Sequence, residues 1–137
     1  MRVMAVDYGD SRTGIAVSDE SASLVGEAWV ISEKNTAAVV QAIVTGAVTR
    51  NARVIVVGFP KNMNGTVGPR AEKSEQLVGQ LRSKCDIEVV LWDERLTTMS
   101  ANRILTDTGR HGKKRKKTID AVAASLILES YLGYISR

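Results

Sequence analysis

The sequence predicts an α/β fold, a mixed five-stranded sheet with helices on both faces, in one domain over residues 1–137. Short apolar runs at residues 53–59 and 87–92 are typical of strands buried on both faces. Segments with apolar residues three and four apart separate these runs, as in amphipathic helices. Together with an N-terminal strand meander they give the element order βββαβαβα. With 44% hydrophobic residues, a chain of this length can bury its own core.

The first three strands are expected over residues 3–8, 15–18 and 27–32. The turn-rich stretch GDSRTG separates the first two, which are close enough in sequence to form a hairpin. A helix is then expected over residues 35–51, because the apolar spacing is helical and Asn35 is a suitable N-cap.

The middle of the chain predicts a strand, a helix and another strand. The loop PKNMNGTVG follows the strand at 53–59 and leads to Pro69, which is favoured as the first residue of a helix. That helix is expected to reach about residue 84, before the strand at 87–92. The single cysteine cannot form an intramolecular disulfide, and no Cys/His cluster is present to bind zinc.

Two helices separated by a basic loop are expected in the last third. The first covers residues 97–109 and ends at Gly109, and the second covers 118–135 with Thr118 as its cap. The loop at 110–117 has a charge of +6, so the remaining 129 residues sum to −2 in a chain whose total is +4. Such a concentrated charge predicts contact with a polyanion at one place, or else a solvated loop, and we expect it to be mobile until nucleic acid binds.

Acidic residues stand where the expected strands end. Asp7 ends the first strand, Asp93 and Glu94 follow the last, and Asp120 lies in the first turn of the final helix. If the first and last strands are parallel neighbours, these carboxylates meet at one edge of the sheet. Taken singly, each also has a structural explanation, as a turn former, a surface ion pair or a complement to a helix dipole.

Three carboxylates crowded in a poorly solvated place need a cation to neutralise them. Oxygen ligands without imidazole or thiolate favour Mg²⁺ or Mn²⁺ over zinc. Two such ions would suit hydrolysis of a phosphodiester bond. The sequence therefore predicts a metal-dependent nuclease.

The stretches VDYGDSRTGIAVSD, VGFPKNMNGTVGPRA, LWDERLTT and KKRKKTIDAVAASLIL, in this order and spacing, resemble the YqgF family of Holliday-junction-resolvase-like proteins. The resemblance covers essentially the whole chain and implies an RNase H-like fold. It implies a nuclease that trims the precursor of small-subunit (16S) ribosomal RNA in the bacterial cytoplasm, with four-way DNA junction resolution as the older assignment. The family's acidic triad falls on Asp7, Glu94 and Asp120, which decides between Asp93 and Glu94. Asn64 departs from the aspartate of many relatives, which argues against a metal role for its loop.

Several polar residues are candidates for contact with the nucleic-acid backbone. Low aromatic content, 4%, argues against base stacking as the main mode of recognition. His111, the only histidine, is either a proton shuttle or a plain loop residue. The candidate contacts are Arg12, Lys61, Asn62, Arg70, Lys113, Lys114, Arg115, Lys116 and Lys117.

Two other classes of function compete with a nuclease. An ATP-dependent phosphotransferase of the sugar-kinase type needs two such lobes, and the length supplies one. A binding module without catalysis would gain nothing from carboxylates that face a phosphate backbone. We expect RNA rather than DNA as the partner, no membrane association, a cytoplasmic location, and a monomer or homodimer.

Overall fold

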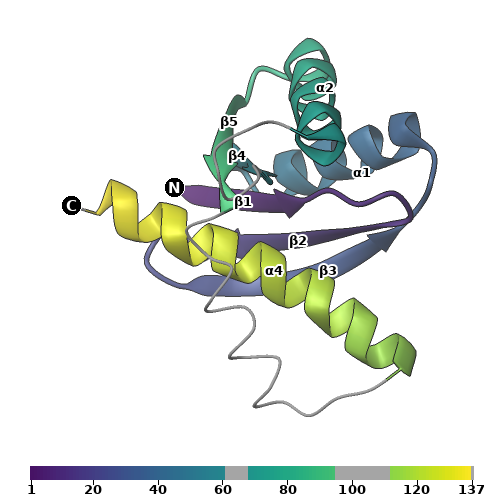
Figure 1. Cartoon of the computed structure of the whole chain (residues 1–137). Coiled ribbons are helices and arrows are strands. Elements are labelled where there is room, and N and C mark those ends of the chain that lie inside the picture. Colours follow the sequence, from purple (N-terminus) through teal and green to yellow (C-terminus); the bar gives the residue numbers. More distant parts are fainter. Residues whose placement is uncertain (61–67, 95–111, 137) are drawn as a thin grey trace.

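The computed structural model describes residues 1–60, 68–94 and 112–136. Its centre is a five-stranded sheet in the order β3-β2-β1-β4-β5 (Figure 1). The central strand β1 pairs in parallel with β4, which pairs in parallel with β5, while β2 and β3 complete the sheet as antiparallel strands. The strands are β1 (Arg2–Asp7), β2 (Arg12–Ser18), β3 (Val25–Ser32), β4 (Ala52–Phe59) and β5 (Glu88–Asp93).

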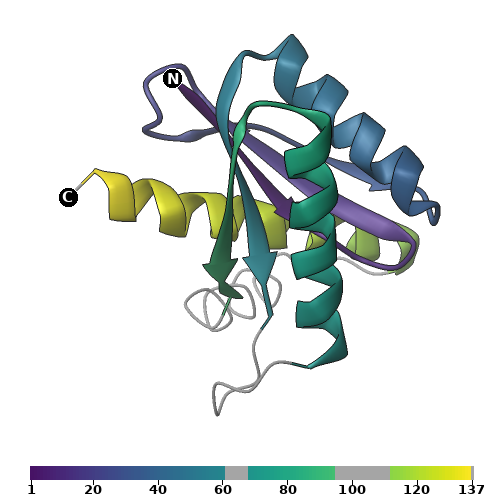
Figure 2. The same ribbon diagram turned by 90° about the horizontal axis from the view of Figure 1, so that it is seen from above.

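Helices cover both faces of the sheet, as expected. Figure 2 shows the sheet between α4 (Gly112–Ile135) on one side and α1 (Thr36–Thr49) with α2 (Pro69–Lys84) on the other. Successive side chains of β1 point to opposite faces of the sheet. Met4 packs toward α1 and α2, and Ala5 packs toward α4. Burial on both faces explains why β1 and β4 are continuous apolar runs.

The helix signals in the sequence are confirmed for α1 and α2. The side chain of Asn35 accepts a hydrogen bond from the backbone N–H of Ala38 at 3.0 Å, which caps α1. Pro69 is the first residue of α2, where its missing N–H is not needed. β2 begins at Arg12, three residues earlier than predicted, so the turn of the hairpin is shorter than GDSRTG.

The expected start of the final helix is wrong. α4 begins at Gly112 rather than at Thr118, so residues 112–117 form its first turns instead of a loop. Lysine and arginine are good helix formers and this segment contains no proline, so nothing in it stops the helix. The helix expected over residues 97–109 lies outside the described residues, as do Arg110 and His111.

None of the helices in the described part of the chain combines the length and the apolar character that crossing a membrane requires.

Candidate active site

Asp7 is the last residue of the central strand and lies on the α4 face of the sheet. It follows Ala5 by two positions, and Ala5 packs against α4. Burial raises the pKa of Asp7 from 3.8 to about 6, and the negative charge of Asp120 adds to the effect. The positive charge of Arg70 and a hydrogen bond with Glu94 act in the opposite direction.

Glu94 comes directly after β5 and joins Asp7. Burial and the charge of Asp7 raise the pKa of Glu94 from 4.5 to about 7. The two carboxyls are hydrogen-bonded to each other, and this bond raises the pKa of Glu94 and lowers that of Asp7. Asp93 ends β5 in register with Phe59 and contributes only a minor charge effect to Glu94.

The two acids do not come from neighbouring strands, which corrects one sequence-based expectation. β4 lies between β1 and β5, so the side chains must meet across it. Gly58 makes this possible, because a Cβ atom there would lie 2.8 Å from Glu94 Cδ and 2.7 Å from Ile127 Cδ1. A residue with any side chain at this position would occupy the space that the glutamate uses.

A second glycine brings α4 to the same place. Gly14 of β2 pairs with Asp7 of β1, and a Cβ atom on Gly14 would overlap the backbone oxygen of Asp120. The main chain of α4 therefore crosses β2 directly over Gly14, which places Asp120 beside Asp7. Sequence reasoning missed this role, although a glycine inside an apolar strand is a signal for close backbone approach.

The carboxylate of Asp120 is directed to Arg12. Arg12 Nε lies 3.1 Å from Asp120 Oδ2, and the two side chains are 38% and 23% exposed. In the residues that the structure describes, no three His, Cys, Asp or Glu side chains are arranged to hold a metal ion. The structure thus joins Asp7 and Glu94 as a pair and holds Asp120 beside them, in an ion pair.

The structure describes the surroundings of only some of the other residues predicted to contact nucleic acid. Arg70, in the first turn of α2, lies close enough to lower the pKa of both Asp7 and Glu94. Lys61 and Asn62 lie outside the described residues. The other five belong to the first turns of α4, and their side chains are also outside the described set: Lys113, Lys114, Arg115, Lys116 and Lys117.

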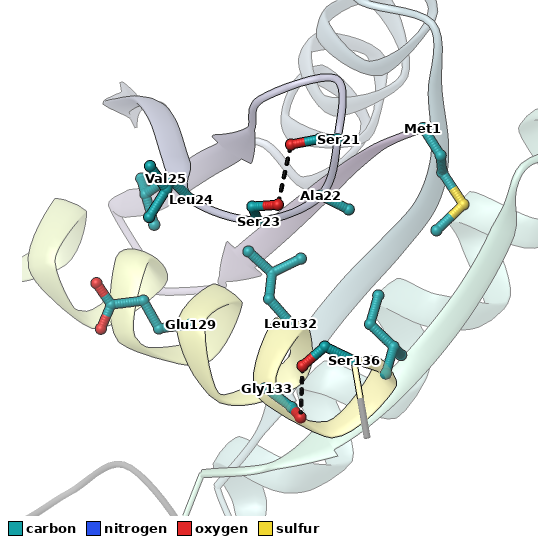
Figure 3. Close-up of a pocket in the computed structure, with 11 residues that line it drawn as sticks. Met1, Ser21, Ala22, Ser23, Leu24, Val25, Glu129, Leu132, Gly133 and Ser136 are labelled. Carbon is teal, nitrogen blue, oxygen red and sulfur yellow. Dashed lines mark hydrogen bonds between the residues drawn. The ribbon is translucent and has the colours of Figure 1, made fainter.

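A large cavity lies at the other end of the hairpin, away from the acids. Its volume is about 720 Å³, and it opens between Met1, the β2–β3 turn and the end of α4 (Figure 3). Serine hydroxyls and apolar groups line it, with Glu129 at its edge. It contains none of the candidate acids, so volume alone does not locate the chemistry of this protein.

Comparison with known proteins gives a consistent result. A family model described as "RuvX: Holliday junction resolvase" matches residues 1–134. A Halothermothrix orenii protein named "Putative pre-16S rRNA nuclease" is 42% identical over 135 residues, 98% of this chain and 96% of its own length. A Geobacillus kaustophilus protein of the same name is 44% identical over 137 residues, 96% of this chain and 97% of its own.

Solved structures resemble the fold at low sequence identity. Thermus thermophilus RuvC in complex with a Holliday junction substrate matches with a TM-score of 0.64 at 10% identity, covering 97% of this chain and 96% of its own. The fowlpox virus resolvase with Holliday junction DNA matches with a TM-score of 0.62 at 12% identity, over the full length of both chains. These likenesses confirm the predicted RNase H-like fold.

Proposed function

Because the chain belongs to the RuvX family of Holliday junction resolvases, we propose that it is a nuclease whose substrate is the precursor of 16S ribosomal RNA. The family match and the curated relatives confirm the sequence-based prediction of a nuclease. The observation that carries the site assignment is the carboxyl pair of Asp7 and Glu94, with the pKa of both groups raised by burial. Perturbed pKa values of this kind are typical of functional sites.

The donor groups fit a hard divalent cation. Asp7 and Glu94 share a proton because two carboxylates cannot both ionise cheaply in a partly buried place. A cation bound there would take the place of this proton, and Asp120, whose charge raises the pKa of Asp7, would add a third carboxylate by leaving its ion pair with Arg12. Oxygen donors favour Mg²⁺ or Mn²⁺, and we propose two ions held by these three residues. Such ions, when bound, activate the attacking water and stabilise the leaving oxygen.

The other residues of the site act on the substrate and on the acids. Arg70 lowers the pKa of both buried carboxyls, so it favours their ionised, metal-binding form. Arg12 neutralises Asp120 and is available to a phosphate once a metal ion takes that carboxylate. The basic first turns of α4 supply further positive charge for the nucleic-acid backbone.

Relatives of different closeness favour RNA over DNA as substrate. The two relatives named above for pre-16S rRNA are 42% and 44% identical to this chain over nearly its whole length. The structures that contain Holliday junction DNA are 10–12% identical, a level at which only the fold is shared. Cleavage of four-way DNA junctions is therefore the second candidate function.

The deciding experiment incubates pure protein with Mg²⁺ or Mn²⁺ and, in parallel, end-labelled 16S precursor RNA, single-stranded DNA and a four-way DNA junction. We expect cleavage of the RNA that needs no ATP and leaves 5′-phosphate and 3′-hydroxyl ends. Ca²⁺ should allow binding with little turnover, because it holds its ligands less regularly than Mg²⁺. The matched control is the Asp7→Asn protein.

Each alternative gives a different result. Cleavage of the junction alone would assign the protein to DNA resolution. Release of phosphate from ATP with every nucleic acid left intact would assign it to the phosphotransferase class. Tight RNA binding without either reaction would make it a binding module.

A further inference from the structure

A polar groove begins beside the acids and continues onto the opposite face of the sheet. A pocket of about 260 Å³ lies between the start of α1 and α2, with Tyr8, Lys34 and Lys73 among its lining residues. A narrower pocket of about 30 Å³, which includes Arg70, shares Tyr8, Asp10 and Lys73 with it. We call the two together the Lys73 groove. Its narrow end contains Arg70, the residue whose charge acts on Asp7 and Glu94.

The groove carries an excess of positive charge. Arg70, Lys73 and Lys34 contribute three cations, while Asp10 is its one acid among the described residues. The hydroxyls of Tyr8 and Thr36 lie 3.0 Å apart in a hydrogen bond and add neutral polar groups to the wall. Cations together with hydroxyl groups are the usual contacts of phosphate and sugar.

The ion pair between Lys73 and Asp10 is easily broken. Lys73 Nζ lies 2.6 Å from Asp10 Oδ1, and the two side chains are 52% and 82% exposed. Ion pairs this exposed contribute little to stability, so breaking this one costs little. A phosphate that enters the groove can therefore take over Lys73, and Asp10 competes with it.

The path of the groove selects a flexible ligand. Asp7 lies on the α4 face of the sheet, whereas Tyr8, the next residue, packs with the core of the α1 and α2 face. A nucleic acid that contacts both must bend around the end of β1. Duplex nucleic acid is too stiff for such a bend, and the volume lies just below the range of about 300–1,000 Å³ found for small-molecule sites.

We propose that the Lys73 groove binds the single-stranded flank of the substrate, with Lys73 and Lys34 on the phosphate next to the one that is cleaved. The inference rests on the proposed nuclease function, and it adds a strand path and a preference for substrates with an unpaired flank. It also predicts that Asp10 weakens binding, because its carboxylate competes for Lys73 and repels the phosphate.

The test measures binding of a short fluorescein-labelled single-stranded RNA in Ca²⁺, for wild type, Lys34→Ala/Lys73→Ala, Asp10→Asn and Lys84→Ala. The double variant should bind roughly tenfold more weakly, and its log–log salt slope should be shallower by about 0.7, the value for one phosphate contact on a single strand. Asp10→Asn should bind more tightly than wild type. Lys84, exposed at the far end of α2, is the matched control and should change nothing.

Several results would overturn the proposal. The first is a wild-type salt slope in the double variant, and the second is an equal loss of affinity for a blunt RNA duplex that has no flank. The third is loss of AMP binding with unchanged binding of RNA, which would make the groove a site for free nucleotides. Asp10→Asn keeps the test valid if the double variant folds poorly, because weaker binding there would contradict the proposal.

The same proteins separate this inference from the proposed function. If wild type cleaves no nucleic acid while the variants change RNA binding as expected, the nuclease assignment fails and the groove stands. If wild type cleaves the precursor and the double variant cleaves and binds it identically, the groove fails and the nuclease assignment stands.

Discussion

Asp7 ends the first strand of the β1–β2 hairpin and Asp19 directly follows the second, yet their surroundings are opposite. Asp19 follows β2 and accepts hydrogen bonds from the hydroxyl of Ser21 at 2.8 Å and from the backbone N–H groups of Ser23 and Leu24. These bonds lower the pKa of Asp19, whereas burial raises that of Asp7. The fold satisfies Asp19 with its own donors and leaves Asp7 beside a second acid.

Asp19 stabilises a turn, whereas Asp7 needs a proton or a cation to neutralise its charge. Asp19 stabilises the β2–β3 turn as an anion, so its negative charge stabilises the folded state. The charge of Asp7 destabilises the folded state until a proton or a metal ion neutralises it. Such an arrangement is retained for function rather than for stability.

The largest difference is expected when Asp7 and Asp19 are each replaced by asparagine. Asp7→Asn should reduce single-turnover cleavage by at least about a hundredfold, because even indirect partners of a metal site cost 10–100-fold. Its metal-free Tm at pH 7 should equal or exceed that of wild type, since a repulsion is removed. Asp19→Asn should cleave normally and melt at a lower temperature. Wild-type cleavage by Asp7→Asn would end the assignment.

A second pair of variants tests the choice between adjacent acids. Glu94→Gln should lose cleavage as Asp7→Asn does, because Glu94 is the residue that shares a proton with Asp7. Asp93→Asn should retain cleavage, since Asp93 has only a small effect on the charge of Glu94. The reverse result would move the site to Asp93.

The next effect in size is on pH dependence. The pKa values of Asp7 and Glu94, about 6 and about 7, mean that Mn²⁺ must displace protons below pH 7, so its affinity should rise between pH 5 and 7.5. Without metal, the folded state holds more protons than the unfolded state between about pH 4 and 7, so stability should fall as pH rises through this window. Asp19 has the opposite sign, and its contribution is lost as pH falls below its ordinary value of 3.8.

Calorimetric Mn²⁺ titrations and chemical denaturation in EDTA across this pH range measure both effects. Asp7→Asn should show a flatter dependence in each, while Asp19→Asn should keep the wild-type profile above pH 5. A metal affinity that is constant from pH 5 to 7.5 would contradict the raised pKa values.

The sequence predicted the acidic ends of the buried strands and two of the helix starts, because the relevant signals are local. Apolar runs ending in Asp7 and Asp93 placed acids at the carboxyl ends of buried strands, and Asn35 and Pro69 marked helix starts that the structure confirms. The choice of Glu94 over Asp93 came from the family resemblance, since strand alternation does not fix the direction of a residue just beyond a strand.

Features that depend on distant segments were not predicted. The position of β4 between β1 and β5 is a property of the sheet order, and local patterns do not encode it. Arg12 meets Asp120 across 108 residues, so nothing near Arg12 in the sequence points to its partner. The start of α4 was misplaced because Thr118 is a good cap by type, yet the basic residues before it also favour a helix.

A smaller effect is expected from the glycines that admit the acids. Gly14→Ala should destabilise the protein by about 1–3 kcal/mol, because its Cβ would meet the backbone of Asp120 rather than a flexible side chain. Gly58→Ala should reduce both cleavage and stability, since its Cβ would meet the end of Glu94 and the buried side chain of Ile127. Gly79→Ala, in an open position of α2, should stabilise by about 0.5–1 kcal/mol. Urea denaturation and cleavage rates measure the three variants, and a Gly14→Ala protein as stable as wild type would show that α4 can move away.

The smallest effect concerns Arg12, which forms an ion pair with Asp120. The pair is partly exposed, so Arg12→Gln should change the free energy of unfolding by less than about 1 kcal/mol. Removing the guanidinium frees Asp120 and takes away a positive charge, so Mn²⁺ should bind severalfold more tightly in the absence of RNA. If Arg12 also contacts a phosphate, the log–log salt slope of RNA binding should become shallower by about 0.7. Calorimetry and fluorescence anisotropy separate the two roles, because tighter metal binding with an unchanged slope would limit Arg12 to holding Asp120.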